Sequence, residues 1–557
     1  MASCTEEGWK NPCTRLVRDI YTITHTTKER KMKKRKLFLA ATLAAGMMMS
    51  MTGMAEEQEL VYVTNVNTGS MNAHMSSGNA QLAQSRVYDG LVDSTEEGIV
   101  PALAESWEIS DDGLVYTFHL RKNVKFTDGE PFNAEAAKMN FDAVQENKDA
   151  YSWMGLTGRI ASVEAVDEYT LVLTLTEPYY PTLQELSFTR PYAFMSPNCF
   201  IDGHSIDGVN STIGTGPYII TENVDEQYAT FEANEDYWDG APAIKKITRK
   251  IIPDGQTAFL SMAKGEANLA FAENGATLID ADSTELLEAQ GYQVIMSDPV
   301  STGIILTNTG NQDLAIAEKA VRLAFWYSID RDTLCDVVFS GTALPADKLE
   351  YDTMPYCSDL GLEERGYNIE KAGELLEEAG WTLEDGAEYR TKEGKELSMD
   401  LCYFSDKTNY KTVAELIQDS AKASGIKINL IGEEANSIYA RRKSGDYELM
   451  LDTSWGLPYE SYMTANILIP GGSYQYCSQG LEGADEFYAL VNETLTGTDE
   501  AKRAEQFKEI FTYIHDEAAV IPLYYNCLQI IAPENLENIQ FAMSQYELPI
   551  QKFYFTE

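Results

Sequence analysis

Histidine is scarce in this chain, with only five in 557 residues. Four of them lie beyond residue 55, and they are far apart in the sequence: His74, His119, His204 and His515. This spacing disfavours a metal site built from several histidines. The metalloprotease sequence H-E-x-x-H is also absent. We interpret His119, in an alternating segment, and His515, in a helical one, as structural.

Other catalytic motifs are incomplete. Residues 203–207 lack the final glycine of the G-x-S-x-G nucleophile turn. Residues 213–218 (IGTGPY) could form a phosphate-binding loop, but no Lys-Ser or Lys-Thr follows them, so we interpret them as a tight turn that leads into a strand. No motif supports an enzyme. A secreted hydrolase stays open as an alternative without a signature.

No C-x-x-C pair occurs among the eight cysteines. Two of them precede residue 55, and the other six are widely scattered: Cys199, Cys335, Cys357, Cys402, Cys477 and Cys527. An exported chain could form disulfides, but a body of this size does not need them. We expect most of these side chains to be small buried hydrophobic groups.

Positive charge is also in short supply, and the formal net charge is −44. Beyond residue 55 the chain has 33 Lys and Arg against 83 Asp and Glu, a formal charge of −50. Such a body repels nucleic acid and anionic lipid, so neither is expected as a partner. The charge suits a soluble secreted protein, and attraction for cationic ligands is the other interpretation.

One short apolar run, residues 37–51, follows the basic residues 33–36 and precedes the small residues before Ala55. This order predicts a secretory signal peptide that begins at Met32 and is cut after Ala55. The run is too short for a membrane anchor, and no cysteine at the cut indicates a lipid anchor. Residues 1–31 are interpreted as upstream leader. The body, from Glu56, is predicted to be exported to the periplasm or the outside of the cell envelope.

Residues 101–144 contain the clearest local pattern. Asp112-Gly113 predicts a hairpin whose second strand alternates in residues 115–120. Residues 124–127 are predicted as a further strand, closed by a turn at 128–129. Asn133 is then expected to cap a helix with one apolar stripe.

Strand and helix patterns alternate along the rest of the body, which predicts an α/β fold. The expected strands are residues 59–63, two around 167–168 within 164–175, 218–220, 247–252, 426–430 and 447–451. The expected helices are one that begins near residue 82, then 315–327, one that starts at 328–331, 369–379 and 412–424.

The amino-acid sequence of residues 101–144 closely resembles the signature of the family 5 extracellular solute-binding proteins, the receptors of ABC importers for peptides and nickel chelates. Two further blocks resemble the family, residues 179–191 and residues 431–459. The resemblance spans about residues 59–553. Within the family it is most similar to the nickel-binding receptors of nickel ABC importers.

This resemblance implies a two-lobed periplasmic-binding-protein fold of type II, α/β, with the extra subdomain of the peptide- and nickel-binding cluster. Residues 1–55 would be leader and signal, residues 56–298 with 525–557 would form lobe I, and residues 299–524 lobe II. The implied function is capture without catalysis of a nickel chelate, the metal with a small carboxylate chelator such as histidine. The alternative is an oligopeptide receptor. The implied partners are the ligand and the ABC permease subunits; a monomer without a resident cofactor is expected.

The resemblance also suggests site residues. Arg190 matches an arginine that clamps the chelator's carboxylates, for which the guanidinium fork is suited; pairing with a protein carboxylate is the alternative. Aromatic side chains suit a cleft that encloses a small solute, although core packing would explain them equally. Those that match cleft positions are Trp153, Tyr439, Trp455 and Tyr459, with Tyr546 where nickel receptors have a threonine. His74, with Met71 and Met75, is the candidate metal ligand.

Several positions depart from the nickel receptors. Their second cleft arginine aligns with Ala150, their loop methionine with Gln81, and their metal-ligating histidine with Gly472. Peptide receptors commonly have an aspartate just after the Trp-Gly pair, where this chain has Leu457-Pro458-Tyr459. The last departure favours a nickel receptor over a peptide receptor. The glycine in place of the histidine leaves the identity of the metal undecided.

Overall fold

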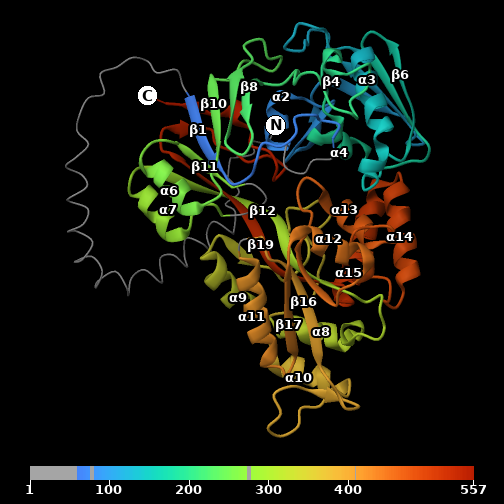
Figure 1. Cartoon of the computed structure of the whole chain (residues 1–557). Coiled ribbons are helices and arrows are strands. Elements are labelled where there is room, and N and C mark those ends of the chain that lie inside the picture. Colours follow the sequence, from blue (N-terminus) through green and yellow to red (C-terminus); the bar gives the residue numbers. More distant parts are fainter. Residues whose placement is uncertain (1–58, 76–80, 273–276, 408, 557) are drawn as a thin grey trace, which may run out of the picture. The chain divides into compact units, whose positions relative to one another are not determined.

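The longest strands of the protein, β12 (Tyr292–Thr307) and β19 (Val520–Pro533), pair antiparallel at the centre of a large mixed sheet (Figure 1). A computed structural model of the chain describes residues 59–75, 81–272, 277–407 and 409–556. The predicted leader, signal peptide and cleavage site lie outside these residues. In the described part the sheet has eleven strands. Its order is β17 (Lys427–Glu433), β16 (Ser398–Phe404), β18 (Leu449–Thr453), β12, β19, β11 (Leu269–Phe271), β1 (Glu59–Thr64), β10 (Lys246–Ile251), β9 (Tyr228–Ala233) and β8 (Tyr218–Val224), with β13 (Ala343–Pro345) paired to β19.

β12 and β19 link two groups of strands. On one side β16 runs parallel to β17 and β18, and on the other β1 runs parallel to β10 and β11. The pairing of β12 with β19 shifts register at three places between Met296 and Ile304. The predicted lobe boundaries at 298/299 and 524/525 fall within these two strands. The division of the chain at these residues remains a prediction.

The hairpin predicted around Asp112-Gly113 is confirmed as β4 (Ala104–Ile109) and β5 (Val115–Leu120). Gly113 has a φ of +69° and its N–H bonds to the carbonyl of Ser110, as a tight turn requires. The two strands predicted within 164–175 are also confirmed. Together they form a four-stranded sheet with the order β4, β5, β7 (Thr170–Leu175) and β6 (Ile160–Asp167).

The strand predicted at 124–127 is wrong. In its place there is one isolated bridge between Lys125 and Pro131. The backbone N–H groups of this segment bond elsewhere, that of Phe126 to the carbonyl of Glu130 and that of Thr127 to the carbonyl of Gly214. The alternation of apolar residues therefore reflects the burial of Val124 and Phe126, and the segment does not pair as a β-strand.

The helix predicted over 315–327 is only partly correct. Residues Ala315–Ala317 form one 3-10 turn, and Glu318 is extended, with φ −73° and ψ 123°. The α-helix α8 begins after it and spans Lys319–Tyr327. The apolar spacing continued across the break because both parts pack on the same core, with Ile316 and Val321 fully buried.

The remaining predicted elements are confirmed within a few residues. The helices have these bounds: α2 Gln81–Val87, α3 Ala134–Glu146, α4 Thr182–Leu186, α5 Thr189–Tyr192, α6 Gly255–Ala263, α7 Ala281–Glu288, α9 Arg331–Leu334, α10 Ile369–Glu378, α11 Tyr410–Lys422, α12 Ala435–Ser444, α13 Glu460–Leu468, α14 Ala484–Thr496 and α15 Glu500–Asp516. Three two-stranded sheets complete the list: β2 (Val92–Thr95) with β3 (Gly98–Pro101), β14 (Thr391–Lys392) with β15 (Lys395–Glu396), and β20 (Leu536–Glu537) with β21 (Tyr554–Phe555).

The turn at residues 213–218 is the predicted turn into a strand. It packs on the end of α2, and the N–H of Gly216 bonds to the carbonyl of Val87 at 2.9 Å. A Cβ at Gly214 would lie 2.0 Å from that carbonyl oxygen, and one at Gly216 would lie 2.5 Å from the carbonyl carbon. The two glycines allow close backbone approach, which explains the Gly-Thr-Gly spacing without a phosphate.

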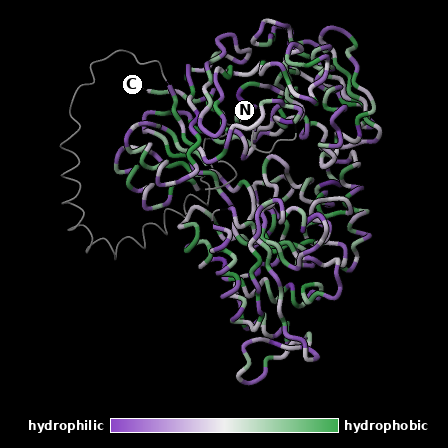
Figure 2. The backbone as a smooth tube through the Cα atoms, in the orientation of Figure 1, coloured by the Kyte–Doolittle hydropathy of each residue, from purple (hydrophilic) through white to green (hydrophobic). Residues whose placement is uncertain are grey.

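Hydrophobic residues follow the strands of the large sheet, as Figure 2 shows, and β19 is buried along its length up to Pro533. The six cysteines in the described part are free and buried, as expected from their scatter. Among the described helices none is long and apolar enough to cross a membrane.

Candidate functional site

Aromatic side chains from four segments of the chain meet at one place. The Trp153 ring lies 5.4 Å from that of Trp455 and 5.7 Å from that of Tyr459, both edge-on. Tyr459 in turn contacts Phe188 at 5.2 Å and Tyr546 at 6.1 Å. We call these five residues the aromatic cluster. Both tryptophans keep part of their surface exposed, which leaves aromatic faces available to a ligand.

The loop after β18 brings Trp455 and Tyr459 to the cluster. It lies against β12, since the N–H of Leu457 bonds to the carbonyl of Val300 at 2.9 Å. Gly456 has a φ of +60°, and a Cβ there would lie 2.1 Å from the Val300 carbonyl oxygen, so only glycine fits this approach. The peptide bond between Leu457 and Pro458 is cis.

The C-terminal segment holds the same loop from the other side. The side-chain amide of Gln545 donates to the carbonyls of Trp455 and Leu457, at 2.8 and 3.0 Å. Tyr546, the next residue, thereby reaches Tyr459. Gln184 of α4 also donates to the carbonyl of Pro458, at 3.3 Å. The loop is positioned by contacts from parts of the chain that lie far from it in the sequence.

Arg190 lies beside the aromatic cluster. It has extended backbone angles, φ −129° and ψ 139°, between the turns of α5, and it precedes a cis proline. Its guanidinium is close enough to the hydroxyl of Tyr459 to lower the pKa of that group. Its Nε is buried without a hydrogen-bond partner in the described part of the chain, and none of the salt bridges there includes Arg190. Among the described residues, therefore, no carboxylate pairs with Arg190.

The hydroxyl groups near Arg190 are neutral at physiological pH. Burial raises the pKa of Tyr459, against smaller lowering effects of Arg190 and Gln81. Burial also raises the pKa values of Tyr151 and Tyr546. The site therefore offers one cation, neutral phenols and aromatic faces, a combination suited to a compact anion with some apolar surface.

Comparison with known proteins identifies the chain. Residues 98–473 match the family described as bacterial extracellular solute-binding proteins, family 5 Middle. The chain belongs to this family. It is 36% identical over 500 residues to the nickel-binding periplasmic protein of Escherichia coli K12, which covers 89% of this chain and 95% of that protein.

Two further relatives define the range of this solute-binding family. The crystal structure of NikA from Brucella suis in complex with Fe(III)-EDTA superimposes with a TM-score of 0.85 at 35% identity, covering 89% of this chain and all of that one. The dipeptide-binding protein of E. coli K12 is 26% identical over 508 residues, 85% of this chain and 90% of that protein. The chain thus has the two-lobed α/β fold of the family, as the resemblance implied.

The cluster of this family 5 protein contains four of the residues expected from sequence, together with Arg190 beside it: Trp153, Trp455, Tyr459 and Tyr546. Tyr439 lies further out, 46% exposed, where its ring contacts Phe404 and lies under the guanidinium of Arg442. Sequence reasoning did not select Tyr151 or Phe188. The only sequence signal that could have found them is that each is an aromatic residue two positions from an expected site residue, Trp153 or Arg190.

His74, the expected metal ligand, lies in a buried environment of its own. Its Nδ1 is 2.9 Å from the hydroxyl of Ser205, and its ring is 5.8 Å from that of Phe200. Burial lowers its pKa to about 4. None of its contacts with the described residues joins it to the aromatic cluster, and the described residues contain no group of three or more His, Cys, Asp or Glu that could hold a metal ion. A role for His74 at a metal remains a prediction.

Gly472, which the resemblance aligns with a metal-ligating histidine, has no room for a side chain. A Cβ built there would lie 2.3 Å from the carbonyl oxygen of Ile467. Any larger residue would require the end of α13 to move. The backbone of Ile467 thus occupies the space that a histidine side chain at this position would need.

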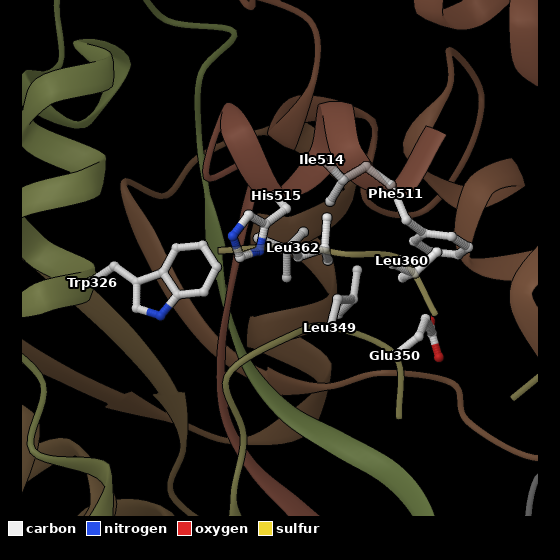
Figure 3. A pocket seen from close by; sticks show the side chains of 9 residues that line it. Trp326, Leu349, Glu350, Leu360, Leu362, Phe511, Ile514 and His515 are labelled. Atoms are coloured by element: carbon white, nitrogen blue, oxygen red, sulfur yellow. The ribbon is translucent and has the colours of Figure 1, made fainter. Parts of the chain in front are cut away.

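A small cavity of about 10 Å³ lies elsewhere, between α8 and α15 (Figure 3). Trp326 and His515 pack edge to face on one side of it, with ring centroids 5.0 Å apart, and Glu350 lies on the other. Burial raises the pKa of Glu350 to about 7 and lowers that of His515 to about 4. The volume suffices for about one water molecule, so this is not a ligand site.

Proposed function

We propose that this protein is the extracytoplasmic receptor of an ABC importer and that it captures a metal chelate, nickel with a small carboxylate chelator such as histidine. The observation that carries the proposal is Arg190, a partly buried guanidinium beside the aromatic cluster, with a buried Nε that has no acceptor among the described residues. A chelate supplies carboxylates for the guanidinium and ring or chain surface for the tryptophans.

The relatives support this assignment. The E. coli relative is named a nickel-binding periplasmic protein, and the B. suis relative was solved with an iron chelate. The chain has no histidine at the aligned ligand position, and Gly472 leaves no space for one. A ligand that brings its own donors therefore fits better than the bare ion, because imidazole is a favoured nickel donor that the protein does not supply there.

An oligopeptide receptor is the second candidate, supported by the dipeptide-binding relative. The residues after the Trp-Gly pair argue against it. Where peptide receptors commonly place an aspartate for the peptide amine, this chain has Leu457 and a cis Pro458, both buried.

We further propose that the body is exported after cleavage at Ala55 and acts at the cell envelope as a monomer that presents its ligand to the permease without chemical turnover. The two lobes would be residues 56–298 with 525–557 and residues 299–524. β12 and β19 would form the hinge, since they join the two groups of strands and their pairing is irregular between Met296 and Ile304.

Titration calorimetry tests the ligand. A Ni²⁺–histidine chelate is expected to bind much more tightly than free Ni²⁺ or short peptides. Arg190→Ala should weaken chelate binding by roughly ten- to a hundred-fold, because a charge-assisted contact in a closed site is worth about 1.5–3 kcal/mol. Arg190→Lys should recover part of the loss, since it keeps the charge but not the fork.

Arg441→Ala is the matched control. Arg441 pairs with Glu433 at 2.7 Å and is not part of the cluster, so its loss should leave chelate affinity unchanged. Tight binding of peptides without binding of any nickel chelate would replace the nickel assignment by the peptide one.

A further inference from the structure

Arg86 is a fully buried arginine of α2, with 1% of its surface exposed. Its guanidinium lies between two aromatic rings, 5.1 Å from the centroid of Tyr62 on β1 and 5.6 Å from that of Phe231 on β9. Nη1 donates to the carbonyl of Leu82 in the preceding turn. The side chain is thus enclosed between α2 and the large sheet, where α2 packs on β8 (Figure 1).

The other two nitrogens of Arg86 are not satisfied. Within the described residues neither Nε nor Nη2 has a hydrogen-bond acceptor, and no carboxylate there forms a salt bridge with this guanidinium. Nε and Nη2 lie along the same edge of the planar group, the edge that meets an oxyanion or halide with two parallel N–H bonds. A buried charge without a partner costs several kcal/mol, so this edge requires an occupant.

Tyr218 supplies a third unsatisfied donor, on the strand against which α2 packs. This residue is fully buried at the start of β8, and its hydroxyl has no partner among the described residues. Burial raises its pKa and the charge of Arg86 lowers it by a smaller amount, so the phenol is protonated at neutral pH.

Arg322, which is equally buried, shows one way in which this chain satisfies such a group. Its Nη2 meets the carboxylate of Glu517 at 3.2 Å, and its Nε and Nη1 donate to the carbonyls of Glu517, Ile316 and Ala317. Arg86 has two aromatic faces in place of a carboxylate. The two nitrogens of Arg86 that lack an acceptor among the described residues point to a negative charge that comes from outside the chain.

We propose that Arg86 and Tyr218 hold a small monovalent anion, chloride or one of similar size, between α2 and the large sheet. The surrounding side chains of Tyr62, Phe231 and Tyr218 are fully buried, which favours a small anion over a larger organic one. The anion would neutralise the guanidinium and join α2, which also carries Gln81 of the ligand site, to the sheet. The inference does not depend on which ligand the protein transports.

Anomalous diffraction from crystals grown in sodium bromide locates the anion. We expect a bromide peak within hydrogen-bond distance of Nε and Nη2 of Arg86 and of the Tyr218 hydroxyl. Crystals of Arg86→Met should lack this peak. A water molecule at the guanidinium edge, without anomalous signal, would overturn the proposal.

Thermal unfolding gives the second test. At constant ionic strength, replacing gluconate by chloride should raise the midpoint by about 1–3 °C, because an anion that binds only the folded state stabilises it. Arg86→Met should abolish this shift. Tyr218→Phe removes one hydroxyl and keeps the ring, so it should raise the chloride concentration that gives half of the shift by about fivefold. This variant tests the proposal if Arg86→Met does not fold.

Arg121→Met is the matched control. Arg121 also stacks on an aromatic ring, that of Trp238 at 4.5 Å, and its Nε donates to the carbonyl of Ala102. Its loss removes one positive charge from the same part of the molecule and should leave the chloride shift intact. An equal chloride shift in wild type, Arg86→Met and Tyr218→Phe would show a general salt effect and overturn the proposal.

Discussion

Two buried glutamates and one half-buried glutamate show how the surroundings of a single residue set its chemistry. Burial raises the pKa of Glu185, Glu350 and Glu547 to about 7 in each case. Glu185 accepts bonds from the hydroxyl of Tyr179 and from two backbone N–H groups, and Glu547 accepts one from Thr189. Glu350 instead lies in the small cavity among apolar side chains. Its ionisation should therefore be a direct cost to folding.

The first prediction concerns Glu350→Gln and pH. The folded-state pKa of Glu350 is above its unfolded value of about 4.5, so the folded state holds this proton more tightly and stability is lost as pH rises from about 4.5 to 7. Glutamine does not ionise. The unfolding free energy of the variant, relative to wild type, should increase by about 2–3 kcal/mol between pH 5 and pH 8.

Urea unfolding at the two pH values measures this difference. Glu384→Gln is the control, since Glu384 is exposed and its replacement should shift the unfolding free energy equally at both pH values. A Glu350→Gln variant whose difference from wild type does not change with pH would contradict the assignment of a buried, titrating carboxyl.

At the scale of elements, a short sequence signal predicts a helix correctly where nearby residues satisfy its backbone hydrogen bonds. Asn133 begins α3 with extended backbone angles, and its side chain accepts the N–H of Ala136 at 2.9 Å. The buried stripe of α3 includes Phe141 and Val144. The cap and the stripe together explain why this helix was predicted from sequence with its correct start.

The second prediction is that Asn133→Ala lowers the unfolding free energy by about 1 kcal/mol, because one N–H of the first turn loses its acceptor. Asn133→Asp keeps an oxygen at the same position and should stay close to wild type. Urea unfolding of the three proteins distinguishes them. Equal losses in both variants would mean that Asn133 acts through packing and not as a cap.

At the scale of the whole molecule, two strands carry the connection between the groups that the resemblance assigns to separate lobes. β12 and β19 each continue from one group of strands into the other, and the aromatic cluster draws Trp153 from one predicted lobe and Trp455 from the other. A ligand that contacts both sides would favour the closed arrangement by its differential contacts.

The third prediction is that a saturating nickel chelate reduces the radius of gyration measured by small-angle scattering. Closure about β12 and β19 brings the two lobes together and buries the ligand. Arg190→Ala, at a chelate concentration that saturates only the wild type, should keep the larger radius. An unchanged radius in the wild type at full occupancy would exclude closure as the response to this ligand.

The sequence by itself determined the local structure and the family. Hairpins, capped helices and strand alternation depend on neighbours within a few residues, so Asp112-Gly113 and Asn133 identified their elements correctly. The same local information failed at residues 124–127 and at Glu318, where the backbone bonds of the segment were decided by contacts with remote turns and with the core.

Only the tertiary structure decided which of the candidate site residues lie together. The resemblance named Trp153, Trp455, Tyr459 and Tyr546, but it could not tell a cleft residue from a core residue, because both are aromatic. Their contacts with one another, the lack of a carboxylate at Arg190 within the described residues and the blocked position at Gly472 arise from segments up to several hundred residues apart. Arg86 is the extreme case: a lone arginine in an ordinary helix becomes informative only when the sheet buries it between two rings.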